Sequence, residues 1–180
     1  MKVDGIEVNN DDAVYGPFVI QRGWKIHTET TDEAKKGECI LDDDGNRIPN
    51  LIGFWGRPVW TMEEFDDACP FPEPLPNELV FTPKGKQPDY KHPEFLARKK
   101  EYSRKRWGYL LLKTLEPSNV EFEGASLDDP STWGDVEEAI KKELPEYEFK
   151  GLLDLIYEAN AIDPQKQEAN RNTFLSQRRA

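Results

Sequence analysis

The sequence predicts an α+β fold, in which a small N-terminal antiparallel β region leads through a proline-rich connector to a C-terminal helical bundle of about four helices. Three observations carry this prediction: short apolar, β-branched segments before residue 60, eight prolines between residues 57 and 93, and apolar residues at helical spacing after residue 93. The predicted division is a β-rich region at 1–60, a connector with a short helix at 61–92 and a helical domain at 93–180. A chain of 180 residues buries about 70% of its unfolded surface, so it can form a substantial core.

The β region is predicted from short apolar runs bounded by turn residues. Arg22-Gly23 ends the first run, and Asp44-Gly45 suits a tight hairpin turn because glycine adopts positive φ without strain. Pro49 has no amide proton, which places it on an edge strand or at the start of a strand. The predicted strands span 14–20, 24–30 and 48–55.

The connector is predicted from the spacing of its prolines. Residues 69–76 read CPFPEPLP, and each proline fixes its own φ and biases the preceding residue towards extended backbone. We therefore expect an ordered, extended connector that is partly polyproline II. A short helix at 61–67 is expected before it, with Thr61 as the N-cap and Glu64 completing a capping box.

Three of the predicted helices begin with a proline, which loses no hydrogen bond at the first helical position. These prolines are Pro93, Pro130 and Pro164, and Asp129 and Asp163 precede two of them as N-caps. The predicted helices span 93–115, 130–143, 146–160 and 164–176.

The sequence shows no grouping of residues with the spacing of a catalytic or metal site. Its soft metal ligands are His27, His92, Cys39 and Cys69. No two of these are spaced to share a turn or a helix face. The acidic loop 42–46 fails as a calcium loop, because the positions that need Gly and Glu hold Arg47 and Gly53. Since a nucleophile elbow and a glycine-rich phosphate loop are also missing, we expect no enzymatic activity, no cofactor and no metal.

Composition indicates an intracellular protein without a membrane segment. The N-terminus lacks the apolar core of a signal peptide, no run approaches the roughly 18 apolar residues of a membrane span, and two cysteines do not make a disulfide framework. The net charge of −11 disfavours nucleic-acid binding, since proteins that bind duplexes are normally basic.

Charge is segregated along the chain. Eight basic residues against Glu94 and Glu101 give the window 91–113 a charge of +6, so the remainder carries −17. One interpretation is that this basic helix lies against the chain's own acidic segments and balances them. The other is that it docks an acidic protein partner or, less in keeping with the net charge, nucleic acid. For a partner surface we favour the basic helix and the proline segment, with Phe71, Pro74, Pro76, Arg104, Arg106, Trp107 and Tyr109 as contact residues.

Three stretches carry a family resemblance. They are VWTMEEFDDACPFPEP at 59–74, YSRKRWGYLLLKTLEP at 102–117, and the region 127–175, which contains LDDPSTW at 127–133 and YEANAID at 157–163. In this order and spacing they resemble small proteins of tailed bacteriophages, namely the tail assembly chaperones and related tail accessory proteins. The resemblance covers roughly residues 55–176.

The resemblance implies a non-enzymatic accessory protein without a cofactor. Such a protein would act in the host cytoplasm, bind the long tape-measure protein and keep it soluble until the tail tube polymerises around it. Two alternatives belong to other classes: a structural virion component, such as a connector or minor tail protein, and a phage inhibitor of a host defence protein whose acidic surface imitates DNA. The +6 helix counts against the inhibitor, because a DNA mimic spreads its negative charge regularly.

Overall fold

The computed structural model describes residues 2–3, 6–7, 14–28 and 33–162, so the predicted helix 164–176 and its Asp163 cap lie outside the described residues. The helices are α1 (Glu63–Ala68), α2 (Pro93–Leu115), α3 (Val136–Glu143) and α4 (Glu146–Ala159), with 3-10 turns η2 (Glu33–Lys35), η3 (Pro76–Glu78) and η4 (Glu116–Ser118). The strands are β1 (Lys2–Val3), β2 (Ile6–Glu7), β3 (Tyr15–Trp24), β4 (Pro49–Gly56), β5 (Leu79–Thr82) and β6 (Gly85–Pro88).

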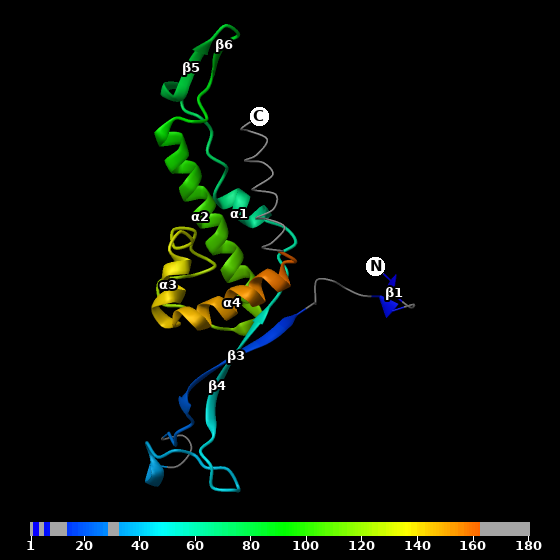
Figure 1. The fold of residues 1–180 in the computed structure, drawn as a ribbon, viewed down its shortest axis with the longest axis vertical. Coiled ribbons are helices and arrows are strands. Elements are labelled where there is room, and N and C mark those ends of the chain that lie inside the picture. The colour runs from blue at the N-terminus through cyan, green and yellow to red at the C-terminus, as the bar shows by residue number, and fades with distance from the viewer. Residues whose placement is uncertain (1, 4–5, 8–13, 29–32, 163–180) are drawn as a thin grey trace.

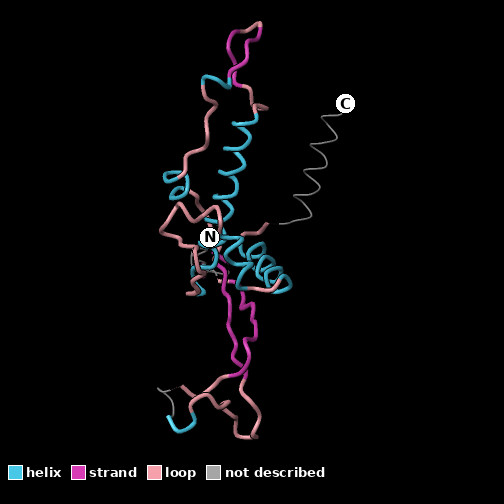
Figure 2. The backbone as a smooth tube through the Cα atoms, turned by 90° about the vertical axis from the view of Figure 1, so that its left-hand side faces the viewer, coloured by secondary structure: helices cyan, strands magenta, loops and turns pink. Residues whose placement is uncertain are grey.

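A helical body lies at the centre of the molecule. The β3–β4 ribbon projects from it towards one end of the long axis, and the β5–β6 ribbon projects towards the other (Figures 1 and 2). The strands form three separate antiparallel pairs, β1–β2, β3–β4 and β5–β6. The prediction of an α+β fold, with a small antiparallel β region near the N-terminus and helices towards the C-terminus, is confirmed.

The β3–β4 ribbon is longer than the sequence predicts. Its register pairs Phe18 with Phe54, Val19 with Gly53, Ile20 with Ile52 and Gln21 with Leu51. β3 continues through Gly23 to Trp24, so the predicted break at Gly23 is wrong. Of the separate strand predicted at 24–30, residues 25–28 show only an isolated bridge from Ile26 to Cys39, and residues 29 and 30 lie outside the described residues. Gly23 has φ +68° and lies within an irregularity of the pairing between Gln21 and Trp24. A bulge of this kind bends a strand without ending it, because glycine accepts the positive φ.

The acidic loop at the far end of this ribbon forms the predicted turn. Gly45 has φ +81°. The carboxylate of Asp42 accepts hydrogen bonds from the backbone N–H groups of Asp44 and Asn46, at 3.0 and 2.8 Å. A carboxylate used in this way stabilises a turn of the chain itself. β4 then begins at Pro49, as its missing amide proton predicts.

The connector contains a hairpin that its proline pattern does not predict. β5 and β6 pair from Leu79 opposite Pro88 to Thr82 opposite Gly85. Pro83 follows Thr82 in the turn, where its fixed φ suits a corner position, and Gly85 takes φ +100°. The hairpin is compatible with its prolines because they stand in the turn and at a strand end, where no ladder hydrogen bond is lost.

The boundaries of α2 agree with those predicted from the sequence, whereas those of α1 differ from the prediction. α2 spans the predicted 93–115 with Pro93 in the first turn, and α4 ends one residue before the predicted 160. α1 begins at Glu63 with Met62 in the N-cap position and without a side-chain cap, so the capping box from Thr61 is wrong.

α3 begins at Val136, later than the predicted start at 130. Asp129 stabilises a turn in place of a helix, since its carboxylate accepts hydrogen bonds from the N–H and the hydroxyl of Ser131 at 2.9 and 2.7 Å. The hydroxyl of Thr132 donates back to the carbonyl of Asp129 at 2.8 Å. Such local side-chain bonds compete with helix formation, so Pro130 begins a turn.

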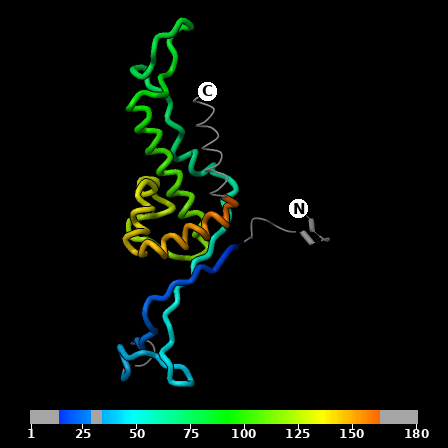
Figure 3. The backbone as a smooth tube through the Cα atoms, viewed as in Figure 1, coloured from blue at the N-terminus to red at the C-terminus, as the bar shows by residue number. Residues whose placement is uncertain are grey.

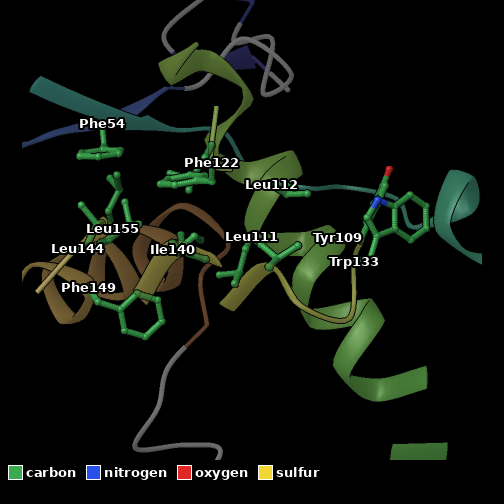
Figure 4. Packing of buried hydrophobic residues seen from close by; sticks show 14 of the residues in the cluster. Phe54, Tyr109, Leu111, Leu112, Phe122, Trp133, Ile140, Leu144, Phe149 and Leu155 are labelled. Atoms are coloured by element: carbon green, nitrogen blue, oxygen red, sulfur yellow. The ribbon is translucent and has the colours of Figure 1, made fainter. Parts of the chain in front are cut away.

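The core extends from an aromatic cluster at Trp133 to a mixed cluster of aliphatic and phenylalanine side chains at α4 (Figure 4). In the first, the ring of Trp133 lies 4.8 Å from that of Tyr109 and 5.6 Å from that of Phe65, which joins α1 and α2 to the loop before α3. In the second, buried side chains of α4 such as Leu155 pack beneath Phe54 of the ribbon.

At Gly108 the backbones of two parts of the body approach each other closely. A Cβ atom at this position would lie 1.8 Å from the carbonyl oxygen of Trp133, far inside the 3.0 Å that real Cβ atoms respect. Backbone cannot rotate away as a side chain can, so α2 reaches the Trp133 loop only because residue 108 has no side chain.

We predict that Gly108→Ala destabilises the fold by about 3 kcal/mol, although alanine is the better helix former by about 1 kcal/mol. The melting temperature and the urea midpoint of the two proteins measure this loss. Ser103→Ala, on the exposed side of the same helix, is the matched control and should change stability by less than about 0.5 kcal/mol. A Gly108→Ala protein as stable as the parent would contradict the close contact.

Candidate protein-binding groove

A groove of about 550 Å³ lies along α2 and is the candidate site; we term it the α2 groove. From β4 the chain passes α1 and runs beside α2 to the β5–β6 hairpin, and α2 then returns along it (Figure 3). One wall of the groove is therefore α2, and the other comes from residues 59–71 and from the residues that follow α4.

The α2 wall is built by helical spacing. Tyr102, Arg106 and Leu110 recur every four residues, so their side chains lie on one face of the helix. Trp107 borders them and packs on Tyr157 of α4, with ring centroids 6.0 Å apart. The wall is thus apolar and aromatic with one guanidinium in it.

The opposite wall is held in place by ring packing and by one amide. Phe71 packs edge-on against Tyr102, with centroids 5.1 Å apart and ring planes at 77°. Asn160 accepts a hydrogen bond from the N–H of Val59 at 2.9 Å and donates to the hydroxyl of Thr114 at the same distance. Because both ends of the Asn160 amide are used, it positions the wall and leaves little hydrogen-bonding capacity for a ligand.

Two phenols connect α2 to the acidic helix α1. Tyr102 donates to Asp66 at 3.2 Å and Tyr109 donates to Glu64 at 2.6 Å. Burial, together with the neighbouring carboxylate, raises the pKa of each tyrosine, so both remain protonated donors. The hydrogen bond from Tyr109 and the ammonium of Lys113 at 3.2 Å lower the pKa of Glu64.

The basic charges of α2 divide into paired and unpaired sets. The paired ones are Arg98 with Glu78, Arg104 with Glu101 and Asp135, and Lys113 with Glu64 and Glu116. Within the described part of the chain, no ion pair joins Lys99, Lys100, Lys105 or Arg106 to a carboxylate. Lys99 lies two turns before Arg106 on the same face, so two of these cations flank the groove. The chain's own carboxylates therefore balance one part of the basic helix, as the first interpretation predicts, and the docking interpretation stays a prediction.

The predicted contact residues are distributed over several surfaces. Phe71, Arg106 and Trp107 line the α2 groove. Tyr109 does not: it is only 2% exposed and belongs to the aromatic core, which corrects its assignment as a contact residue. The helical period explains this, since residue 109 follows Gly108 on the side of α2 that faces Trp133.

The other predicted residues lie outside the groove. Arg104 pairs with Glu101 at 3.0 Å and with Asp135 at 3.6 Å, and Pro74 and Pro76 stand further along the connector. Sequence reasoning missed Val59 and Ile162, which reach the groove from distant segments and carry no local signal. Tyr102 and Leu110 share the face of Arg106, and their spacing alone would have found them.

One group of metal-ligating side chains forms among the described residues. Glu78, His92 and Glu94 place their ligand atoms within 4.8 Å of one another. Nitrogen and oxygen ligands of this kind suit zinc. Arg98, however, donates to both carboxylate oxygens of Glu78 at 2.6 Å, and the group lies at the positive N-terminus of α2. Because positive charge already occupies this place, the arrangement is better suited to holding the connector than to holding a cation.

No protein-family model matches this chain, and neither does any curated protein or solved structure. Among the described helices, none combines the length and the apolar character that crossing a bilayer requires.

The pKa of Glu78 predicts how stability depends on pH. The two hydrogen bonds from Arg98 lower this pKa from about 4.5 to about 2. A carboxyl group whose pKa is lower in the folded state contributes stability above its unfolded pKa and loses it as the pH falls through the folded value. The urea midpoint should therefore fall between about pH 5 and pH 2.

Glu78→Gln should be less stable than the parent at neutral pH and should lose part of this acid dependence. Glu73→Gln, an exposed change in the same connector, is the control and should keep the profile of the parent. Identical acid profiles for the parent and Glu78→Gln would refute the role assigned to the pair.

Proposed function

We propose that this chain is a non-enzymatic protein of a tailed bacteriophage that binds a tail protein, the tape-measure protein, in the host cytoplasm during tail assembly. The observation that carries the proposal is the α2 groove, an aromatic channel flanked by cations that no described carboxylate neutralises.

The lining of the groove suits a helix of a client protein. Helices bind in apolar grooves through side chains spaced three or four residues apart. Phe71, Trp107 and Leu110 supply apolar contacts of this kind, and aromatic residues commonly dominate binding energy. Arg106 is the charged group within the groove, so the complementary client helix carries an acidic residue beside its apolar stripe.

The charge distribution of the chain supports the same assignment. The remainder of the chain, at −17, keeps it soluble and repels acidic polymers, whereas the +6 window attracts an acidic segment to one place. A protein that keeps a partly folded client in solution needs both a soluble exterior and an accessible apolar groove.

A structural virion component is the second candidate, and the projecting ribbons favour it. Phe81 at the end of the β5–β6 hairpin is 82% exposed, and a ribbon that presents such a ring is suited to docking into a larger assembly. Mass spectrometry of purified phage particles separates the candidates, because a structural part is present in the particle and a chaperone is absent.

We predict that co-expression with the tape-measure protein of the same gene cluster raises the soluble fraction of that protein and that the two co-purify. Arg106→Glu should weaken the complex about tenfold, the effect of reversing one charge in an apolar interface. Added salt should weaken it as well, because the encounter is between opposite charges.

Lys105→Glu is the matched control, since it makes the same charge change on the neighbouring residue, which lies off the groove face of α2. It should leave the affinity within about twofold of the parent. Failure to co-purify with any tail protein would refute the proposal. Equal losses of affinity in Arg106→Glu and Lys105→Glu would show that the client does not bind in the α2 groove.

A further inference from the structure

One stripe of side chains on α2 is open to solvent along most of the helix. Its members recur at alternating steps of three and four residues, which places them on one side of an α-helix. All are exposed except the last, which is half-buried. We term this set the α2 stripe; it consists of Leu96, Lys99, Ser103, Arg106 and Leu110.

The α2 stripe continues the α2 groove towards the N-terminus of the helix. Ser103, Arg106 and Leu110 line the groove. Lys99 and Leu96 lie one and two turns beyond it, and Leu96 is 47% exposed. At the helical rise per residue, the stripe from residue 96 to residue 110 is about 21 Å long and covers about four turns. The surface is therefore long enough to contact several turns of a second helix.

The connector borders the α2 stripe beyond the groove as well as within it. Within the groove, Phe71 packs edge-on against Tyr102. One turn nearer the start of α2, Arg98 donates to the carbonyl of Glu73 at 3.1 Å, so the connector still follows the helix there (Figure 3). Tyr102 and Arg98 are four residues apart and lie on the same side of the stripe. Phe71 and Leu75 are 53% and 47% exposed, so this wall adds apolar surface beside the stripe.

The charges on the α2 stripe have one sign. Lys99 and Arg106 belong to it and Lys100 lies at its edge; within the described part of the chain, no ion pair joins them to a carboxylate. By the helical period, Glu94 and Glu101 lie on the opposite side of α2. A partner without carboxylates would cover two uncompensated cations, which is costly. Charge therefore specifies an acidic partner.

The two ends of the α2 stripe distinguish a helix from other acidic partners. Leu96 and Leu110 stand at these ends and offer apolar contacts, as does Phe71 on the connector wall. An amphipathic helix uses such contacts, because its apolar side chains recur every three or four residues. A nucleic-acid backbone would satisfy the cations and leave the leucines without a partner.

The spacing of the α2 stripe indicates how the second helix packs. Alternating steps of three and four residues are the spacing of a coiled-coil seam, in which two helices cross at about 20° and stay in contact over several turns. Lys99 and Arg106 occupy equivalent positions seven residues apart, so carboxylates that pair with both recur at seven residues in the partner. The long side chains keep their aliphatic stems in the contact and carry their charge to its edge.

We propose that the α2 stripe binds one helix of about four turns from an acidic partner, packed alongside α2 as in a coiled coil. Apolar side chains of that helix contact Leu96 and Leu110, and carboxylates seven residues apart pair with Lys99 and Arg106. For the identity of the partner this inference rests on the proposed function, since the helix is taken to belong to the client. It adds the half of the surface that lies beyond the groove and the sequence pattern that this surface selects.

Binding of designed helical peptides to the full chain tests the proposal. The probes are three fluorescently labelled peptides of three heptads, with leucine at the first and fourth positions of each heptad and glutamate, glutamine or lysine at the fifth and seventh. Fluorescence anisotropy at a peptide concentration that keeps them monomeric should show the glutamate peptide binding about tenfold more tightly than the glutamine peptide. The lysine peptide should bind most weakly, and added salt should weaken the glutamate peptide.

Two substitutions beyond the groove test the length of the contact. Leu96→Asp and Lys99→Glu should each weaken the glutamate peptide about tenfold, and the Lys99→Glu protein should gain affinity for the lysine peptide. Both positions are exposed, so circular dichroism and thermal unfolding should show folded proteins. Lys105→Glu is the matched control, because it makes the same charge change away from the stripe; it should stay within about twofold of the parent.

The outcomes separate this inference from the proposed function. If Arg106→Glu weakens the glutamate peptide and neither Leu96→Asp nor Lys99→Glu does, the partner stops at the groove and the inference is overturned, while the proposed function stands. Equal binding of the three peptides, or tighter binding of a single-stranded oligonucleotide, would overturn it too. So would self-association of the chain that Lys99→Glu abolishes, which would assign the stripe to a second copy. Co-purification with the tape-measure protein tests the proposed function independently.

Discussion

The contact between the backbones of Gly108 and Trp133 is the constraint on which the rest of the structure depends. It lets the loop before α3 lie directly on α2, and it places the Trp133 indole against both Tyr109 and Phe65, which also contact each other. The indole N–H also donates to the carbonyls of Ser126 and Leu127, both at 3.1 Å, so the ring is held from inside its own loop. α1, α2 and α3 take their relative positions from this one packed ring, and the α2 groove is the space that remains on the other side of α2.

Both projecting ribbons are attached to the body by the same kind of ion pair. Arg22 of β3 donates to both carboxylate oxygens of Glu148 in α4, and Arg98 of α2 donates to both oxygens of Glu78 beside β5. Each glutamate side chain is almost fully buried, and such a pair fixes direction as well as distance because its two hydrogen bonds are parallel. Since a buried carboxylate without its partner is costly, these contacts hold each ribbon in one orientation. The first pair directs the inner face of the β3–β4 ribbon towards α4 and so leaves the opposite face exposed.

The α2 groove, which we propose as the surface that binds a client, combines two kinds of attraction. Its aromatic rings offer apolar contact, and Arg106 adds a positive charge that pairs with no carboxylate among the described residues.

Features that depend on neighbouring residues were predictable from the sequence, and features that depend on distant contacts were not. The turn at Asp44-Gly45, the strand start at Pro49 and the bounds of α2 follow from the φ preferences of glycine and proline and from helical periodicity. Three residues that line the groove were singled out from the sequence as contact residues. Arg106 and Trp107 were found because basic and aromatic residues on one helix are a local pattern, and Phe71 was found from the proline segment. The burial of Tyr109 was not predictable, since residues 108 and 133 must meet before one side of α2 becomes interior. The same holds for Val59 and Ile162, whose place in the groove depends on packing between segments that are far apart in the chain.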